Sequence, residues 1–481
     1  MRHTSSNRFP RRFHAASRRL GLSALSAALI LAAPGAGAAD APAAVAQQLS
    51  RAALTDGWSY KFLEGLTTEI GQRLAGTEAE ARAADWAAAQ LKAAGFEAVH
   101  REPVPMTAWL RGAETAEVTA PAPQKLVLTA LGGSVATPGE GIEAEIVLFR
   151  TYAELLAAAP GSLDGKIAVV TERMVRVADG SGYGAANPIR RAGPSEAARR
   201  GAIAYLHRSL GTDSHRLAHT GKLDYAADAP KIPAAALAAP DAEQLERLAA
   251  LGPVRIHLVL TPTERPDAQS WTVVGEVKGR EKPEEVVLIG GHLDSWDLAT
   301  GATDDGAGIA IVAGAARLIA ALPQHPRRTV RVVLFGAEEM DYSGAAYAKA
   351  HAAEAPHIMV AAEADFGTRK AYTFYLPAKA AGTPFARALA ESLTPLGVFI
   401  NREPARFAGA DIDGLQEAGV PVMAARQNGL DYFDTHHTAD DTFDKIDPAE
   451  LAQNVAVWAA AAYLAAEDDI DFRAPAATPS R

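Results

Sequence analysis

Apolar residues follow two different spacings along the second half of the chain, and each spacing predicts a kind of element. Short β-branched runs predict strands at 271–277, 284–289, 329–335, 357–362 and 420–424. Between them, apolar residues recur at helical spacing and predict helices at 306–322, 343–353, 383–396 and 448–465. This alternation predicts an α/β fold with a mostly parallel mixed sheet that is flanked by helices.

The first half of the chain has a different texture. Helical spacing at 59–70 and 78–94 and a strand-like run at 97–104 come first. From 119 to 264, strand-like runs alternate with Gly- and Pro-containing loops, which predicts an inserted, smaller, β-rich domain. No His, Asp and Glu set in this segment has ligand spacing, so His215, His219 and Asp224 are interpreted as solvated surface residues.

Composition narrows the class of protein. The chain has 481 residues, no cysteine, 47 basic and 57 acidic residues. The absence of cysteine excludes disulfides and thiolate zinc sites. Residues 1–38 hold six Arg and no acid, which leaves 41 basic against 57 acidic residues, a net charge of −16, in the remaining chain. This charge argues against nucleic acid or an anionic membrane as a partner.

The N-terminus has the pattern of an export signal. Six Arg precede an apolar run at 20–33, and Ala36-Gly37-Ala38 offers a cleavage site with small residues. The run is too short to cross a membrane comfortably. We therefore expect a signal peptide that is cleaved near Ala38 and a periplasmic or secreted protein; Arg18-Arg19 also fits a twin-arginine signal.

Histidine and carboxylate side chains follow several of the predicted strands. The set suits Zn²⁺, because imidazole and carboxylate together are zinc ligands, and consists of His292, Asp304, Glu339, Asp365 and His437. Two zinc ions about 3.5–4 Å apart need one carboxylate that reaches both. The inventory meets that need with Asp304 as the bridge, His292 and Asp365 on one ion, and Glu339 and His437 on the other.

Two further acids are predicted to act beside the ligands. Asp294 lies two residues after His292, where it can accept the imidazole N–H and fix the tautomer. Glu338 precedes Glu339, and adjacent residues at a strand end point in different directions. Glu338 is therefore the predicted general base, which takes a proton from the attacking water and passes it to the leaving amine.

The order of these motifs resembles the co-catalytic zinc aminopeptidase family: His-x-Asp, Asp-Asp-x-x-Gly, Glu-Glu after a strand, a later Asp, and His-Thr-x-x-Asp-Thr at 437–442. Within it, GHLDSWD at 291–297, PKIP at 230–233, AGVP at 418–421 and His436-His437 are most similar to the plasma glutamate carboxypeptidase group. The resemblance implies the five ligands and the base named above, a peptide substrate and a homodimer. It also implies a peptidase domain in two parts (39–118 and 265–470), a protease-associated domain (119–264) and a tail (471–481).

We therefore expect an exported di-zinc exopeptidase that hydrolyses dipeptides or short peptides from the N-terminal end. His436 is expected to contact the oxyanion or the substrate, and Asp411 and Asp297 to anchor the substrate amine. A glutaminyl-cyclase-like transferase with a single zinc is one alternative, and a carboxypeptidase is another, although Arg369 and Arg426 fit surface charge better than a carboxylate site. A receptor-like protein that has lost its ligands and a binding protein with a structural metal are further rival hypotheses; the intact ligand set argues against the receptor-like one.

Overall fold

The structure is a computed structural model that describes residues 42–473, so the predicted signal peptide lies outside the described residues. Four strands from residue 263 onwards, together with one strand from the first part of the chain, form a five-stranded sheet, called the main sheet below. Its strands lie in the order β1 (Glu97–Leu110), β10 (Thr263–Val277), β12 (Arg328–Phe335), β11 (Lys282–His292) and β13 (Ile358–Glu363). β11 pairs in parallel with β12 and β13, whereas β1 and β10 add antiparallel pairs on one side. The carboxyl ends of β11, β12 and β13 therefore share one edge of the sheet, where ligands bind in α/β folds.

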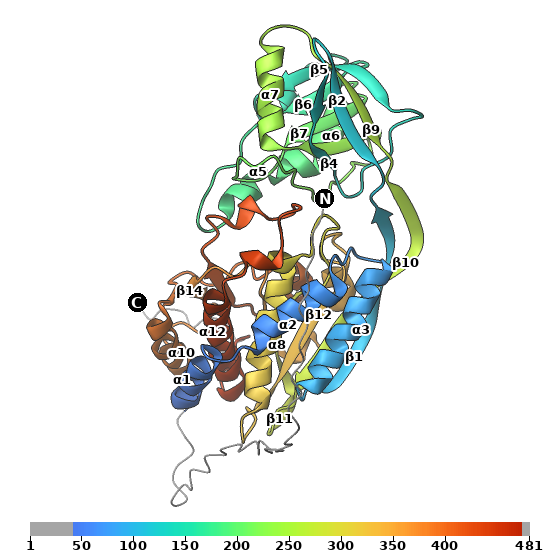
Figure 1. Ribbon diagram of the computed structural model, residues 1–481. Coiled ribbons are helices and arrows are strands. Elements are labelled where there is room, and N and C mark those ends of the chain that lie inside the picture. Colours follow the sequence, from blue (N-terminus) through green and yellow to red (C-terminus); the bar gives the residue numbers. More distant parts are fainter. Residues whose placement is uncertain (1–41, 474–481) are drawn as a thin grey trace, which may run out of the picture. The chain divides into compact units, whose positions relative to one another are not determined.

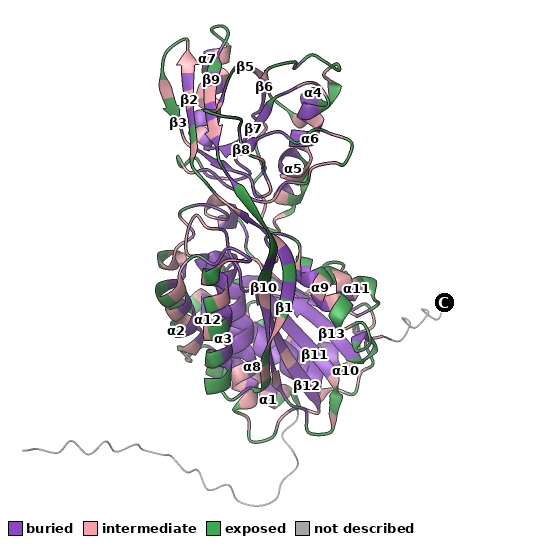
Figure 2. Cartoon of the chain, turned by 90° about the vertical axis from the view of Figure 1, so that its right-hand side faces the viewer, coloured by how far each residue is buried: buried purple, intermediate pink, exposed green. Residues whose placement is uncertain are grey.

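The apolar run of β11 is buried on both faces of the main sheet. Val287 and Ile289 pack into one hydrophobic cluster, and Val286 and Leu288 pack into another, because successive side chains of a strand point to opposite faces. The first cluster is completed by α1 (Pro42–Ala53), α2 (Trp58–Gly65), α3 (Glu78–Ala93), α8 (Ala307–Ala320), α10 (Pro384–Leu393) and α12 (Pro448–Glu467). The second is completed by α9 (Ser343–Ala350) and α11 (Asp413–Glu417). Figure 2 shows helices on both faces of this sheet, and the α/β fold class is confirmed.

A second sheet is formed by the residues between β1 and β10 (Figure 1). Because β1 and β10 pair up to Leu110 and Thr263, the chain leaves the main sheet and returns to it at neighbouring points. The eight strands lie in the order β3 (Gln124–Leu126), β2 (Glu114–Ala120), β9 (Arg255–Leu260), β5 (Ile142–Phe149), β6 (Ile167–Val170), β7 (Ala204–Arg208), β8 (Ala234–Leu237) and β4 (Leu128–Ala130). The helices of this segment are α4 (Tyr152–Ala157), α5 (Ser181–Arg191), α6 (Gly193–Ala198) and α7 (Ala239–Ala249).

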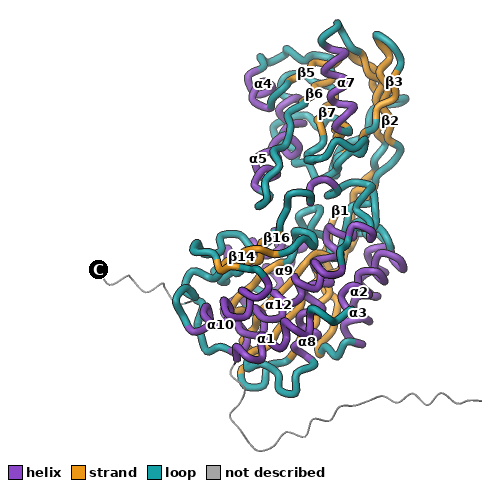
Figure 3. The backbone as a smooth tube through the Cα atoms, turned by 60° about the vertical axis from the view of Figure 1, so that its left-hand side comes forward, coloured by secondary structure: helices purple, strands orange, loops and turns teal. Residues whose placement is uncertain are grey.

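A third, smaller sheet completes the strands of the chain. It consists of β15 (Phe399–Ile400), β14 (Ala371–Tyr375) and β16 (Ala424–Gln427), and Figure 3 shows β14 beside β16. Short turns of 3₁₀ or π type lie between the main elements: η1 (Leu66–Ile70), η2 (Ala302–Gly306), η3 (Ala355–His357), η4 (Thr394–Leu396), η5 (Ala410–Ile412), η6 (Tyr432–Asp434) and η7 (Phe443–Lys445). Within residues 42–473, no helix has the length and apolar character that a membrane crossing requires.

One predicted strand is displaced in the structure. The run at 420–424 was expected to be a strand, but the ladder begins only at Ala424. Val422 forms an isolated bridge to Ala361, and Val420 and Val422 fill the second hydrophobic cluster. These residues are therefore apolar because they lie buried in an extended segment beside β13, although this segment is not a strand of a sheet.

A buried carboxyl joins α3 to the main sheet. Glu80 is fully buried, and its Oε1 accepts a hydrogen bond of 3.0 Å from the backbone N–H of Trp271 in β10. Burial raises the pKa of Glu80 from 4.5 to about 8. The folded protein therefore holds a proton that the unfolded chain releases, and the free energy of unfolding falls by about 1.4 kcal/mol per pH unit between those two values.

Glu80→Gln keeps the acceptor for Trp271 but cannot ionise. We expect its free energy of unfolding, measured by denaturant titration, to match that of the wild type below pH 4.5 and to exceed it increasingly up to pH 8. Glu78→Gln, an exposed change on the same helix, is the matched control. Parallel pH profiles for the wild type and Glu80→Gln would contradict this account of the buried carboxyl.

Candidate metal centre and active site

The strand β11 ends in glycines that let an acidic turn approach closely. A Cβ at Gly291 would lie 2.7 Å from Oδ2 of Asp305, so any side chain there would displace that carboxylate. Asp305 accepts a hydrogen bond of 3.0 Å from the backbone N–H of His292. This bond holds η2 against the end of β11, and Asp304 in the same turn is left to face the histidines.

The five predicted zinc ligands come from different elements and meet at the carboxyl edge of the main sheet. His292 ends β11, Glu339 follows β12, Asp365 follows β13, Asp304 lies in η2, and His437 lies in the loop after η6. All of them are buried except Asp365, whose side chain is 23% exposed. Strand order and the positions of the turns therefore bring together side chains that are up to 145 residues apart in the sequence.

His292 faces two carboxylates through one ring nitrogen. Its Nε2 lies 3.1 Å from Oδ1 of Asp304 and 3.7 Å from Oδ1 of Asp365. Its Nδ1 lies 3.1 Å from the backbone carbonyl oxygen of Asp294 and 3.4 Å from the carboxylate of the same residue. Because both are acceptors, the proton belongs on Nδ1, and the lone pair of Nε2 is free for a metal.

His437 has the same arrangement on the other side of Asp304. Its Nε2 lies 3.2 Å from Oδ2 of Asp304 and 3.1 Å from Oε2 of Glu339. Its Nδ1 lies 3.2 Å from the backbone carbonyl oxygen of Thr220, which belongs to the segment between β1 and β10. The carbonyl accepts from Nδ1, so Nε2 is the ring nitrogen that a metal ion between the ring and the carboxylates would bind.

The distances fit zinc as the partner of these side chains. Ligand atoms that lie about 2.0–2.2 Å from a tetrahedral zinc ion are about 3.3–3.6 Å from one another. Three of the four histidine–carboxylate distances above, 3.1, 3.1 and 3.2 Å, are slightly shorter than that range, and the fourth, 3.7 Å, is slightly longer, so the side chains are close enough to share an ion. Oε1 of Glu339 is buried and accepts no hydrogen bond from the described residues. Buried carboxylate oxygens without donors are costly unless a cation neutralises them.

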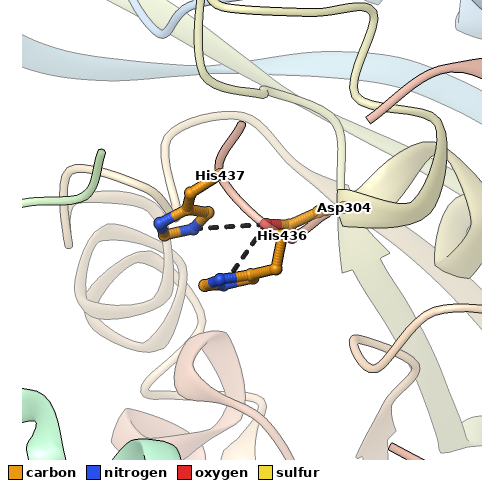
Figure 4. A group of neighbouring side chains, drawn as sticks. All are labelled: Asp304, His436 and His437. Carbon is orange, nitrogen blue, oxygen red and sulfur yellow. Dashed lines mark ion pairs between the residues drawn. The ribbon is translucent and has the colours of Figure 1, made fainter. Parts of the chain in front are cut away.

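Three overlapping groups have ligand atoms within 4.8 Å of one another: Asp304 with His436 and His437, His292 with Asp305 and Asp365, and His292 with Asp304 and Glu339. Figure 4 shows the first group, in which both imidazoles are directed at Asp304. Nε2 of His436 lies 3.5 Å from Oδ2 of Asp304, slightly farther than that of His437. The contact with Glu339 belongs to His437, and this favours His437 as the ligand of the pair.

Burial and mutual repulsion govern the ionisation of the acids. Burial raises the pKa of Glu339 to about 7 and that of Asp365 to about 6, with His437 and His292 respectively opposing the rise. For His437, burial lowers the pKa, but Glu339 and Asp304 more than compensate and raise it well above its usual value. The cluster thus has an excess of negative charge, which a divalent cation would stabilise.

Glu338 and Asp294 have distinct positions beside the ligands. Glu338 lines a pocket of about 350 Å³, and its Oε2 lies 4.0 Å from Nε2 of His292. Asp294 is completely buried, and its two oxygens accept hydrogen bonds from the backbone N–H groups of Glu338 (3.0 Å) and Glu339 (3.3 Å). Asp294 therefore fixes the backbone of both glutamates in addition to its contact with the His292 ring.

The three predicted substrate contacts have different surroundings. His436 lines the pocket, stacks on His437 with a ring separation of 3.6 Å, and has a buried Nδ1 without a partner. Asp411 is buried and accepts a hydrogen bond of 2.7 Å from the hydroxyl of Ser343. Asp297 accepts two bonds, of 2.9 and 3.0 Å, from Arg111. Neither Asp411 nor Asp297 lines the pocket, so these contacts give no support to their predicted role as amine anchors.

Two residues that support the site were not singled out as functional from the sequence. Arg73 is fully buried and donates hydrogen bonds to the carbonyl oxygens of Leu293 (2.6 Å) and Gly301 (3.0 Å). These two bonds hold both ends of the loop between His292 and η2. Asp441 accepts a bond of 3.1 Å from the backbone N–H of Asp304. Asp441 lies in the motif at 437–442, a signal that could have found it, whereas the local sequence around Arg73 offers no such signal.

One assignment made for the segment between β1 and β10 is wrong. His219 was interpreted as a solvated residue, but it is 1% exposed. Its Nδ1 lies 2.7 Å from the backbone carbonyl oxygen of His436. Together with Thr220, it shows that this segment contacts the site directly, which local sequence patterns could not reveal because the contact spans 217 residues.

Comparison with known proteins agrees with this geometry. The profile described as "Peptidase family M28" matches residues 272–462. Carboxypeptidase Q from Bos taurus is 37% identical over 415 residues, which are 85% of this chain and 85% of that protein. The carboxypeptidase Q from Homo sapiens is 36% identical over the same shares of both chains.

Solved structures are similar over most of the chain. The crystal structure of a peptidase M28 precursor from Shewanella amazonensis has a TM-score of 0.87 at 45% identity and covers 91% of this chain and 99% of that one. A zinc aminopeptidase from Bacillus subtilis shares the fold, with a TM-score of 0.62 at 19% identity over 86% of this chain and 96% of that one. The prediction of an enzyme of the zinc exopeptidase class is thereby confirmed, and the chain belongs to peptidase family M28.

Proposed function

We propose that this M28 peptidase is an exported exopeptidase that hydrolyses dipeptides or short peptides with two zinc ions per chain. One observation carries the proposal: the two oxygens of Asp304 face different histidines. Oδ1 lies 3.1 Å from Nε2 of His292, and Oδ2 lies 3.2 Å from Nε2 of His437. A carboxylate that is shared in this way is the bridge that a two-metal site requires.

Each ion would have three ligands from the chain. Asp304, His292 and Asp365 would hold one, and Asp304, His437 and Glu339 would hold the other. When bound, zinc supplies a Lewis acid that polarises the scissile carbonyl and lowers the pKa of water. A single-zinc transferase of the glutaminyl-cyclase type is less well supported, because only one of these two groups of ligands would then bind a metal ion.

Glu338 moves the proton in the proposed reaction. Its carboxylate accepts a proton from the attacking water as the new C–O bond forms, and donates that proton to the leaving nitrogen as the C–N bond breaks. Burial raises the pKa of Glu338 well above its usual value, which suits a group that must both accept and donate. His436 lines the same pocket, and a contact between its ring and the oxyanion or the substrate is part of the proposal.

Recognition of the N-terminal end remains the primary proposal, but one observation favours carboxypeptidase action. Arg190 of α5 lines the pocket and is only 3% exposed. Its Nη1 donates to the hydroxyl of Tyr183 at 2.5 Å, and its Nε is buried without a partner. Its neighbours Arg191 and Lys222 both pair with Asp341, whereas no carboxylate within residues 42–473 forms an ion pair with Arg190.

A buried guanidinium without a counter-ion suits a terminal carboxylate. In a dipeptide the carboxylate carbon is about 4 Å from the scissile carbonyl carbon. The ring of Tyr183 lies 4.9 Å from that of His436, so Arg190 is close to the proposed reaction centre. A dipeptidase that recognises both ends would reconcile the two proposals.

The segment at 119–264 is proposed to be a protease-associated domain that contributes to this pocket. The contacts of Thr220 and the position of Arg190 support that role. The export signal at 1–38 and a homodimer stay predictions of the sequence and of the family resemblance.

Glu338→Gln should bind two zinc ions, as the wild type does, and lose turnover by at least about 10³-fold, because general-base catalysis is removed and every ligand is kept. Glu339→Gln is the matched variant at the next residue, and it should lose or weaken one ion. Metal analysis and dipeptide hydrolysis measure both. An active Glu338→Gln enzyme would exclude this residue as the base.

Asp294→Asn should lower the affinity for zinc by about 10- to 100-fold and reduce kcat, because an amide cannot accept from both glutamate N–H groups and from the His292 ring. Competition with a chelating dye gives the affinity. Asp297→Asn, in the same loop but paired with Arg111, is the control. Equal zinc affinities for wild type and Asp294→Asn would contradict the supporting role.

A free dipeptide, its N-acetyl derivative and its C-terminal amide distinguish the two modes of substrate recognition. N-terminal recognition predicts that acetylation abolishes cleavage, and carboxylate recognition predicts that amidation does. If Arg190 binds the carboxylate, Arg190→Gln should raise KM for the free acid by about 10- to 100-fold with little effect on the amide. Arg191→Gln, which changes a cation of the same pocket that already pairs with Asp341, is the control. An unchanged preference in Arg190→Gln would remove the argument for carboxylate recognition.

A further inference from the structure

The loop at 211–222, between β7 and β8, lies against the turn that carries His436 and His437. Three hydrogen-bond contacts join the two. The backbone N–H of Thr220 donates to the carbonyl oxygen of His437 at 2.9 Å. The carbonyl oxygen of Thr220 accepts from Nδ1 of His437 at 3.2 Å, and Nδ1 of His219 donates to the carbonyl oxygen of His436 at 2.7 Å.

The turn needs such support because of its backbone conformation. His437 has a φ of +60°, in the left-handed region that side chains other than glycine rarely adopt. A residue held there persists only when its surroundings fix it. The hydrogen-bond contacts to its own backbone and ring from the second sheet come from Thr220, and His219 holds the neighbouring carbonyl of His436. The ring of His437 also faces the carboxylates and makes an edge contact with Trp296.

His219 is itself held rigidly. Its Nε2 lies 2.9 Å from Oδ1 of Asp213, and its backbone N–H donates to the hydroxyl of Ser209 at 2.9 Å. The partners of the two ring nitrogens, a carbonyl and a carboxylate, are both acceptors. The side chains of His219 and Asp213 are 1% and 3% exposed, so this chain of bonds is shielded from water.

We propose that His219, supported by Asp213, is a positioning residue for the metal centre. It holds the carbonyl of His436, keeps the turn in its left-handed conformation, and so aims Nε2 of His437 at Asp304 and Glu339. The ion that Glu339 and His437 would hold therefore depends on a loop of the second sheet, while the ion beside His292 does not. This inference rests on the proposed di-zinc function and deepens it.

Two substitutions separate the two ring nitrogens of His219. The amide nitrogen of Asn can take the place of Nδ1, and that of Gln can take the place of Nε2. His219→Asn therefore keeps the bond to His436, whereas His219→Gln keeps the bond to Asp213 and loses the one to the turn. If His219 only filled space in the core, His219→Gln would not bind zinc more weakly than His219→Asn.

The experiment measures zinc stoichiometry and affinity of the full-length mature protein by competition with a chelating dye. The wild type and His219→Asn should hold two ions. His219→Gln and His219→Ala should hold the first ion with unchanged affinity and bind the second about 10- to 100-fold more weakly. Excess zinc should restore much of the lost activity of His219→Gln.

The control is His207→Asn. His207 is also fully buried in the second sheet, but its Nδ1 contacts the carbonyl oxygen of Arg208 and not the site; this variant should bind zinc as the wild type does. If His219→Gln holds both ions as tightly as His219→Asn, the positioning role is wrong, although the proposed function stands. If the wild type itself holds one ion or none, the proposed function fails first. The comparison of Asn with Gln decides the question even where His219→Ala does not fold.

Discussion

Several carboxylates share a small buried volume, and the rest of the site follows from how that negative charge is neutralised. Asp304 is the centre of the cluster, because each of its oxygens faces a different histidine. Burial raises the pKa of Glu338, Glu339 and Asp365. Without a cation, these acids therefore tend to bind protons, which also reduces the negative charge of the cluster. Divalent cations satisfy the constraint better, and the fold presents the Nε2 atoms of the two histidines where such ions would lie.

The remaining acids of the cluster act on the backbone. Asp305 holds the N–H of His292, Asp294 holds those of Glu338 and Glu339, and Asp441 holds that of Asp304. Each of these hydrogen bonds fixes the backbone of a proposed metal ligand or of the proposed base. In each motif, one residue is therefore a proposed ligand or base, and a nearby acid holds the backbone of such a residue in place.

Two parts of the chain complete the site together. The parallel strands β11, β12 and β13 deliver His292, Glu339 and Asp365 to one edge of the main sheet. The second sheet delivers His219 and Thr220 to the turn of His437. Because α5 also lines the pocket, the same segment can shape both the metal centre and the choice of substrate.

The sequence predicted the elements that carry strong patterns. The apolar run of β11 and the helical spacing of α8 and α12 were found, because burial on two faces and helical periodicity are local signals. The motifs brought out the five ligand candidates, which do converge. The strand at 420–424 was misplaced, since an extended buried segment has the same apolar pattern as a strand.

What the sequence could not predict depends on distant partners. Arg73 and His219 are buried, and Arg190 is buried without a counter-ion among the described residues. Nothing in the local sequence of these three residues distinguishes them from surface residues. Their roles follow from contacts with residues about 217 to 228 positions away for Arg73 and His219, and from a place in the pocket for Arg190.

The central claim is that Asp304 is shared by two zinc ions. Anomalous diffraction from crystals grown with zinc, recorded on both sides of the zinc absorption edge, tests it most directly. The account predicts two peaks about 3.5–4 Å apart, one beside His292 and the other beside His437, with the Asp304 carboxylate between them. A single peak at full zinc loading, or two peaks of which neither contacts Asp304, would contradict it.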